Sequence, residues 1–292
     1  MAATSSITNL FDVTGIVAVV TGGGSGLGLE MTQALATNGA KKVYIIGRRR
    51  HILDQAVAEI GQDNIIPIQC DVTDPDALKA AVAFIEKDIG YINLLVANSG
   101  IAGPSGSVPS GSSIRQVQEA LLRISMQEFT NTFHVNCTAV FYTAIAFLGL
   151  LDAGNQTQND YARKGCRSQV IATSSIGSFN RRITAGFAYG ASKAATTMLL
   201  KVLATYLVPY RIRANVLCPG LFPTDLTTDL IHGKSPTEEG AFPLDQIPAE
   251  RAGTPEDIMG PLLYLASRAG AYCNGNCVLT DGGRLSVMPA TY

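Results

Sequence analysis

Short apolar runs alternate along the chain with longer segments of helical periodicity. The apolar runs predict strands at residues 16–20, 43–46, 65–69, 92–98, 169–173, 212–217 and 277–280. The periodic segments predict helices at about 26–37, 51–60, 74–88, 126–151, 189–208 and 255–267. Strands that are apolar throughout need cover on both faces. The pattern therefore predicts an α/β chain with a single doubly wound parallel sheet flanked by helices.

Three stretches depart from this alternation: 102–114 is rich in Gly, Ser and Pro, 152–167 is polar, and 221–251 separates the sixth strand from the last helix. A connection as long as the third is usually a lid or a binding loop. Residues 1–292 are expected to form one domain with its core at about 12–284. We expect the substrate to bind at the lid, whose apolar residues are Leu221, Phe222, Leu226, Leu230 and Ile231.

Composition narrows the class of protein. Hydrophobic residues make up 47% of the chain, which excludes a disordered protein. The 22 basic and 23 acidic side chains nearly cancel, which argues against nucleic acid or an anionic membrane as a partner. The first residues lack the features of a signal peptide, and the uncharged run 135–151 is shorter than the roughly 20 residues that span a bilayer. We therefore expect a cytoplasmic protein in which that run is a buried helix.

The six cysteines are scattered, and no histidine cluster accompanies them. Cys273 and Cys277 lie four positions apart, but two thiols alone do not make a zinc site. We expect no metal, and buried free thiols in a reducing compartment.

A glycine-rich turn, TGGGSGLG, follows the first predicted strand and opens the first predicted helix. Glycines let the backbone turn tightly and approach a pyrophosphate, and free N–H groups at a helix start attract negative charge. The alternative is a purely structural turn. The position between strand and helix favours a dinucleotide cofactor, with candidate contacts at Gly22, Ser25, Gly26, Leu27 and Gly28.

The second predicted strand ends at Gly47 and is followed by Arg48, Arg49 and Arg50. An acidic residue at this strand end would bind the adenosine ribose and repel a 2′-phosphate, but none is present. A guanidinium can instead pair with that phosphate through two hydrogen bonds. The sequence therefore favours NADP(H), with Arg48 as the first candidate. The alternative is a solvated basic helix start.

Tyr189 and Lys193, in the sequence YGASK, are four positions apart and share one face of a predicted helix. A free phenol, with a pKa of about 10, is a poor acid–base catalyst at neutral pH. An adjacent ammonium stabilises the phenolate, so we expect Lys193, together with a cationic nicotinamide in a dry site, to lower the pKa of Tyr189. Ser174 and Ser175 end the fifth predicted strand just upstream, and this placement favours a catalytic reading of the pair.

These motifs together resemble those of the short-chain dehydrogenase/reductase family, whose fold is a Rossmann-type sheet, over about 12–284. The stretch NRRITAGFAYGASKAA and the long insertions are similar to reductases of fungal secondary metabolism. The family resemblance rests on TGGGSGLG, Asp71-Val72, Ala97-Asn98-Ser99-Gly100, Asn136, Ser174-Ser175, YGASK, Cys218-Pro219-Gly220 with Thr224, and Asp281-Gly282-Gly283.

The resemblance implies four catalytic residues. By position, Tyr189 would donate a proton to a carbonyl oxygen or remove one from an alcohol, and Ser175 would hydrogen-bond the same oxygen. Lys193 would hold the nicotinamide ribose, and Asn136 would position a water that links Lys193 to solvent. The hydride would pass between the substrate carbon and C4 of the nicotinamide.

The resemblance also implies further cofactor contacts, although the chain departs from the family pattern: Ala97 and Ser99 replace the first Asn and the Ala of NNAG, whereas Asn98 is kept. Ser25 stands where many NADP-dependent relatives place a basic residue, so phosphate recognition would rest on Arg48. Ser175 and Tyr189 are one position further apart than expected, which leaves Ser174 as a rival and suggests a bulge at 178–182. The implied contacts are with the adenine (Asp71, Val72), its ribose (Asn98, Ser99, Gly100) and the carboxamide end (Pro219, Gly220, Phe222, Thr224).

The predicted function is reduction of a ketone, or the reverse, with NADP(H) on a hydrophobic small molecule such as a polyketide. The alternatives are an enzyme of this fold that uses bound NADP(H) in a cyclisation or isomerisation, and a non-catalytic dinucleotide sensor. Arg181 and Arg182 either contact the substrate or are solvated. The apolar helices at 138–151 and 196–207 predict a homodimer or homotetramer.

Overall fold

The computed structural model describes residues 6, 10–106, 108–156, 159–227 and 235–292. All of the predicted strands form, and they make one parallel sheet in the order β3-β2-β1-β4-β5-β6-β7. The predicted doubly wound α/β fold is therefore confirmed. The strands are β1 (Val17–Thr21), β2 (Lys42–Gly47), β3 (Ile65–Gln69), β4 (Leu94–Ala97), β5 (Gln169–Thr173), β6 (Arg213–Pro219) and β7 (Cys277–Thr280).

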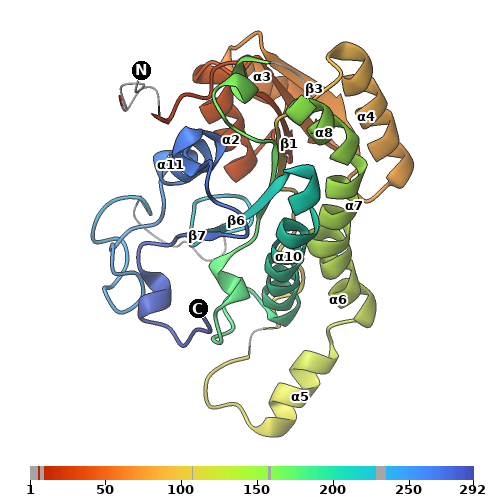
Figure 1. Ribbon diagram of the computed structural model, residues 1–292. Helices are drawn as coiled ribbons and strands as arrows, with labels where there is room; N and C mark the ends of the chain where they lie inside the picture. Colours follow the sequence, from red (N-terminus) through yellow and green to blue (C-terminus); the bar gives the residue numbers. More distant parts are fainter. Residues whose placement is uncertain (1–5, 7–9, 107, 157–158, 228–234) are drawn as a thin grey trace.

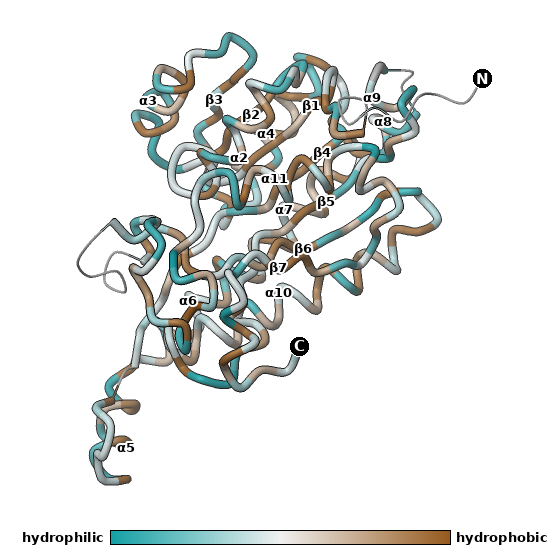
Figure 2. The backbone as a smooth tube through the Cα atoms, turned by 90° about the vertical axis from the view of Figure 1, so that its left-hand side faces the viewer, coloured by the Kyte–Doolittle hydropathy of each residue, from teal (hydrophilic) through white to brown (hydrophobic). Residues whose placement is uncertain are grey.

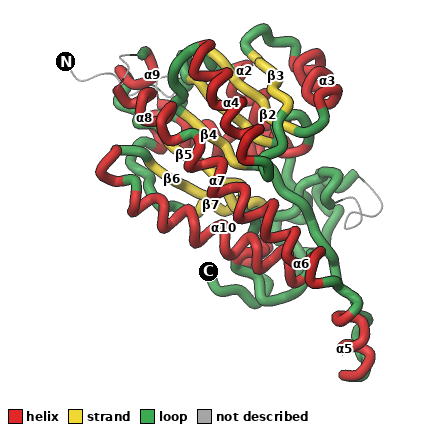
Figure 3. The backbone as a smooth tube through the Cα atoms, turned by 90° about the vertical axis from the view of Figure 1, so that its right-hand side faces the viewer, coloured by secondary structure: helices red, strands yellow, loops and turns green. Residues whose placement is uncertain are grey.

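Helices cover both faces of the sheet, as Figures 1 and 3 show. Alternate residues of each strand point to opposite layers, so Val17 and Val19 of β1 pack in one core cluster and Ala18 and Val20 in the other. This two-sided burial explains why the strands are unbroken apolar runs, seen in brown at the centre of Figure 2. One layer contains α2 (Gly26–Thr37), α3 (Arg50–Ile60) and α11 (Pro255–Ala266), and the other α4 (Pro75–Asp88), α7 (Ala139–Ala146) and α10 (Phe187–Tyr206).

The order of the sheet changes direction at β1. This strand pairs with β2 on one side and with β4 on the other. The chain first extends the sheet from β1 through β2 to β3, and then crosses to the other side of β1 to add β4 to β7. In doubly wound sheets the crevice for a ligand lies beyond the carboxyl ends of the strands at such a point. The fold therefore places a binding site at the ends of β1 and β4.

The prediction of one long helix over 126–151 is wrong. The segment divides into α6 (Met126–Phe133), a π-helical turn (His134–Thr138), α7, and α8 (Leu148–Gln156), which is bent from its predecessor by 43°. In the π turn the Asn136 carbonyl accepts a 2.6 Å hydrogen bond from the Thr196 hydroxyl of α10. A side chain of a neighbouring helix therefore satisfies a carbonyl of the widened turn, which periodicity in the sequence cannot reveal.

The sequence analysis also missed α5 (Ile114–Leu122), which projects from the body of the molecule in Figures 1–3. None of its residues is buried. Ser113 and Gln116 form a capping box at its start, a local signal that the Gly and Ser content of the stretch obscured. The short helix α9 (Asp160–Arg163) likewise interrupts the stretch expected to be polar loop.

The long segment before α11 contains no helix or strand at residues 221–227 and 235–254, the parts that the structure describes. Leu221 and Phe222 are buried and Leu226 is half-exposed, whereas Leu230 and Ile231 lie outside the described residues.

No single described helix is long and apolar enough to cross a membrane. The bent pair formed by α6–α7 and α8 meets the criteria of length and composition, and nothing further. The cysteines are free, but only Cys70, Cys166 and Cys218 are fully buried.

Candidate active site

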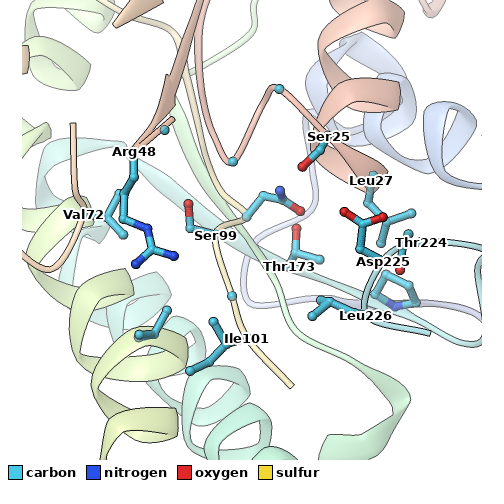
Figure 4. Close-up of a pocket in the computed structure, with 18 of the residues that line it drawn as sticks. Ser25, Leu27, Arg48, Val72, Ser99, Ile101, Thr173, Thr224, Asp225 and Leu226 are labelled. Carbon is cyan, nitrogen blue, oxygen red and sulfur yellow. The ribbon is translucent and has the colours of Figure 1, made fainter. Parts of the chain in front are cut away.

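A cavity of about 360 Å³ lies at the carboxyl ends of β1, β4, β5 and β6, and Figure 4 shows part of its wall. Its size falls within the range of small-molecule sites. Every predicted cofactor contact lines it except Gly28, and every predicted catalytic residue lines it except Asn136. The structure thus brings together side chains that are up to about 200 positions apart in the sequence, from Gly22 to Thr224.

The glycine turn is shaped by close backbone contacts. Gly22 and Gly26 have positive φ angles of 67° and 50°, which side chains other than glycine disfavour. At Gly28 an added Cβ would lie 2.0 Å from the Gly22 carbonyl oxygen and 2.6 Å from Asn98 Nδ2. Gly28 therefore does not touch the cavity, but it lets the first turn of α2 pack against the loop that does.

Basic side chains stand at the β2 end of the cavity. Arg48 and Arg49 both line it, and in Figure 4 the Arg48 guanidinium extends between Val72 and Ser99. Arg50 instead pairs with Asp54 of α3 at 2.8 Å. The cavity wall therefore has two guanidinium groups where the sequence analysis had put forward one first candidate.

Asp71 lies at the same end of the cavity. Burial alone would raise the pKa of its carboxyl, but hydrogen bonds from the Thr73 amide (2.9 Å) and hydroxyl (2.7 Å), with the charge of Arg48, hold that pKa below its usual range. Asp71 is therefore an ionised acceptor at neutral pH.

Asn98 ties β4 to β1. Its backbone amide donates to the Thr21 hydroxyl at 2.9 Å, and its side-chain amide donates to the Thr21 carbonyl at 3.1 Å. The Ser99 amide also donates to the Thr21 hydroxyl, at 3.1 Å. These bonds fix the junction of the two strands where the sheet changes direction.

Lys193 is buried at the β5 end of the cavity. Its Nζ donates a 2.8 Å hydrogen bond to the Thr173 carbonyl and lies 5.8 Å from the centre of the Tyr189 ring. Burial lowers the pKa of Lys193 to about 8. The ammonium therefore points along the cavity wall at the end of β5.

The pKa of Tyr189 is shifted by the protein's own groups. Burial raises it above the usual value, and a hydrogen bond with Ser175 opposes the rise without cancelling it. Lys193 does not reverse the direction, because its Nζ is hydrogen-bonded to the strand rather than to the phenol. The protein's own groups therefore do not lower the pKa of this phenol, and the expected lowering by Lys193 together with a cationic nicotinamide stays a prediction.

The two serines after β5 have different surroundings. The Ser174 hydroxyl donates to the Lys193 carbonyl at 2.9 Å and lies 2.7 Å from the Thr197 hydroxyl, inside the protein. The Ser175 hydroxyl accepts from the Gly177 amide at 3.0 Å and is hydrogen-bonded to Tyr189. A 3₁₀ turn (Ile176–Ser178) and an isolated bridge from Asn180 to Ala290 follow, in the region where the sequence suggested a bulge.

Asn136 is fully buried and lies behind the cavity wall. Its Nδ2 donates to the Ile101 carbonyl (2.9 Å) and the Ser192 hydroxyl (3.0 Å), and its Oδ1 accepts from the Ile101 amide (2.8 Å). The side chain therefore joins the segment after β4 to α10, next to Lys193.

Phe222, which the resemblance assigned to the carboxamide end of the cofactor, lines the cavity while its ring packs against another part of the chain. Its ring is buried against Gly253, where an added Cβ would lie 2.3 Å away, and its carbonyl accepts from the Thr227 hydroxyl at 2.5 Å. The sequence analysis did not assign several lining residues, because no motif marks them and only the folding of their loops brings them in. They include Ile101, Val135, Thr173, Asp225 and Thr227.

Comparisons with known proteins identify the family. A model of the short chain dehydrogenase family matches residues 16–235. Short-chain dehydrogenase/reductase PhomF of Diaporthe leptostromiformis is 46% identical over 288 residues, which cover 97% of this chain and 96% of that protein. Short-chain dehydrogenase/reductase VdtF of Byssochlamys spectabilis is 44% identical over 302 residues, with 97% of both proteins covered.

A solved structure agrees with these matches. The Pseudomonas aeruginosa RhlG/NADP active-site complex is similar with a TM-score of 0.77 at 26% identity, covering 94% of this chain and 98% of that one. The chain therefore belongs to the short-chain dehydrogenase/reductase family of oxidoreductases. The predicted similarity to fungal members of the family is confirmed.

Proposed function

We propose that this protein is a cytoplasmic NADPH-dependent reductase that converts a ketone of an apolar small molecule, such as a fungal secondary metabolite, to a secondary alcohol. The observation that carries the proposal is the joint placement of Tyr189, Ser175 and Lys193 at one end of a cavity whose other end holds two arginines. The end with the tyrosine suits proton transfer to a substrate. The end with the arginines suits recognition of a phosphate of the cofactor.

The residues of the cavity fit NADP(H). At Gly22 and Gly26 the turn carries no side chain that would keep a pyrophosphate from its backbone, and an added Cβ at Gly22 would lie 3.0 Å from Asn98 Nδ2. Arg48 and Arg49 would hold the 2′-phosphate, and Asp71 would accept from the adenine amino group. The NADP in the RhlG complex supports this choice. When bound, the cofactor supplies the hydride.

The phenol of Tyr189 would donate the proton. Because burial raises its pKa, the hydroxyl is protonated at neutral pH, as a general acid that protonates a ketone oxygen must be. Ser175 would hydrogen-bond the same oxygen and orient it. Removal of a proton from an alcohol would instead need the phenolate, the less populated form of Tyr189 at neutral pH.

Lys193 and Asn136 would support this step. Lys193 Nζ, held by the Thr173 carbonyl, is placed to donate to a ribose hydroxyl in the cavity. Asn136 would act through the segment that it anchors at Ile101 and through Ser192 on α10. Ile101, Val135 and Leu226 form an apolar part of the wall for the substrate.

Two rival functions make different predictions. A cyclase or isomerase of this fold would bind NADP(H) without net oxidation of it, and a sensor would bind it without turnover. A proton donor hydrogen-bonded to a second hydroxyl beside a buried lysine favours the reductase, because neither rival requires that set.

The proposed reaction can be followed with a labelled cofactor. NADPH deuterated at C4 is incubated with the protein and a panel of ketones that includes tetralone and para-acetylbenzoate methyl ester. We expect oxidation of NADPH and deuterium on the carbinol carbon of the product. Binding of NADPH with no deuterated alcohol from any ketone of the panel would exclude the reductase and favour the rivals.

Replacement of Arg48 tests whether the protein prefers NADPH to NADH. In Arg48→Ala we expect the Kd for NADPH to rise about tenfold or more while the Kd for NADH stays within about twofold, because only NADPH carries the 2′-phosphate. Arg50→Ala is the matched control, since Arg50 pairs with Asp54. Calorimetry with both nucleotides provides the measurement. An unchanged preference in Arg48→Ala and in Arg49→Ala would remove both residues from this role.

A further inference from the structure

A second cavity, of about 300 Å³, opens beside Tyr189, which lines both cavities. Its wall is formed by the loop at 177–187 and the first turns of α10, together with Thr291. Arg181 and Arg182, which the proposed reaction does not use, both line this second cavity. It is therefore positioned to hold the part of a substrate that extends away from the reacting carbon.

The loop that carries the two arginines is held in place by residues 289–292. The Arg181 amide donates to the Pro289 carbonyl at 2.8 Å, and the Thr291 amide donates to the Phe179 carbonyl at 2.8 Å. The rings of Phe179 and Tyr292 meet edge to face with 4.9 Å between their centres. These contacts hold the part of the loop at 179–181, which leads into the two arginines, against residues 289–292.

The described lining of this cavity contains basic but no acidic side chains. No Asp or Glu occurs between Asp160 and Asp225, or from Gly282 to Tyr292, the segments that supply the walls of the cavity. Among the described residues, neither guanidinium has a hydrogen-bond or ion-pair partner. Arg181 and Arg182 are both exposed at the edge of this cavity, where an anion from solvent can reach them. Two unpaired guanidinium groups at a concave site suit an anion.

The rest of the wall is apolar. Phe179, Ile183 and Phe187 line the cavity with Arg181 and Arg182, and Ile183 and Phe187 are about half-exposed. Exposed apolar side chains around a cavity favour an apolar ligand body, because its binding removes both surfaces from water. The wall therefore combines an apolar surface with a cationic rim.

We propose that the second cavity is a substrate subsite for a carboxylate, so that the ketone reduced by this protein is an apolar molecule with an acidic group bound by Arg181 and Arg182. The inference rests on the proposed reductase function, because Tyr189 joins the two cavities. It narrows the substrate from apolar ketones in general to apolar keto acids.

The test compares an acid with its neutral ester. Calorimetry measures the binding of para-acetylbenzoate and of its methyl ester to the protein saturated with NADP⁺, or to the protein alone if the nucleotide does not bind. We expect the wild type to bind the acid about tenfold more tightly than the ester. In Arg181→Gln and Arg182→Gln the preference should fall severalfold and in the double variant it should vanish, with binding of the ester unchanged. Arg115→Gln, on the projecting α5, removes one charge outside the cavity and should keep the full preference.

The outcomes separate this inference from the proposed function. Absence of any preference for the acid, or a preference that survives in the double variant, would overturn the subsite. A preference that depends on the arginines, with no oxidation of NADPH by acid or ester, would retain the anion site and count against the reductase.

Discussion

Lys193 shows how burial changes the chemistry of a single residue. The side chain is 4% exposed, and its pKa falls to about 8 from the usual 10.5 because burial penalises the charged form. Below pH 8 the folded protein must keep a buried ammonium, which costs about 3 kcal/mol of the free energy of unfolding. A buried cation that reduces stability is explained by function, since its Nζ lies at the wall of the cavity.

The sign of this effect is testable by substitution. Between pH 8 and 10.5 the unfolded chain binds more protons at Lys193 than the folded protein does, so the free energy of unfolding rises with pH. We expect Lys193→Met to be more stable than the wild type at pH 7, by up to about 3 kcal/mol, and this advantage to shrink towards pH 10. Urea unfolding at several pH values gives the difference between the two proteins. A difference that does not change with pH would show that the buried ammonium carries no such cost.

The candidate site was predictable residue by residue to a large extent, because its motifs are local. The turn from Gly22 to Gly28 and the pair Tyr189 and Lys193 depend on short spacings that the sequence displays directly. The direction of the pKa shift of Tyr189 was not predictable, since it depends on burial and on where Lys193 Nζ finds its acceptor. Those quantities exist only in the folded protein.

At the scale of elements, the apolar runs of the sequence predicted the sheet, whereas the periodicity of the sequence did not predict the form of the helices after β4. A strand buried on both faces has a plain signature. The π turn within the long helix involves Thr196 and Ile101, which are distant in sequence from Asn136. The projecting helix α5 packs no residue in the core, although Ile114, Val117 and Leu121 recur at helical spacing; its shortness and the Gly- and Ser-rich stretch before it hid this signal.

The π turn gives a prediction for Asn136. In Asn136→Ala the amide and carbonyl of Ile101 lose their partner and the Ser192 hydroxyl keeps only its bond to the Tyr189 carbonyl, so the free energy of unfolding should fall by about 3 kcal/mol. Asn131→Ala, exposed on α6, is the control and should change it by less than about 1 kcal/mol. Urea unfolding at neutral pH measures both. Equal stability of the two variants would show that this network does not hold the segment after β4.

At the scale of the whole molecule, apolar side chains gather on the outer face of α7 and α10, which lie side by side in Figures 1 and 3. These are the helices from which the sequence predicted self-association. A face of this kind on a folded protein favours burial against a partner, here a second copy of the chain. The exposed residues are Phe141, Tyr142 and Ile145 of α7, and Met198, Val202 and Tyr206 of α10.

We predict that this face forms a homodimer or homotetramer. Light scattering after size exclusion should give a multiple of 30.8 kDa for the wild type and for Phe84→Glu, a control on the exposed side of α4. The double variant Met198→Glu, Val202→Glu should run at 30.8 kDa, because two charges cannot be buried unpaired in an apolar interface. A wild type of 30.8 kDa, or a variant that stays associated, would contradict the prediction.

The central claim, that the phenol of Tyr189 protonates the ketone, is tested most directly by the rate of NADPH oxidation in a single turnover of Tyr189→Phe. We expect the rate with tetralone to fall by about a thousandfold or more, while the Kd for NADPH stays within about twofold of the wild-type value. Tyr272→Phe, which alters a fully exposed phenol, should leave both unchanged. If Tyr189→Phe reduced the ketone at the wild-type rate, the account of this site would be wrong.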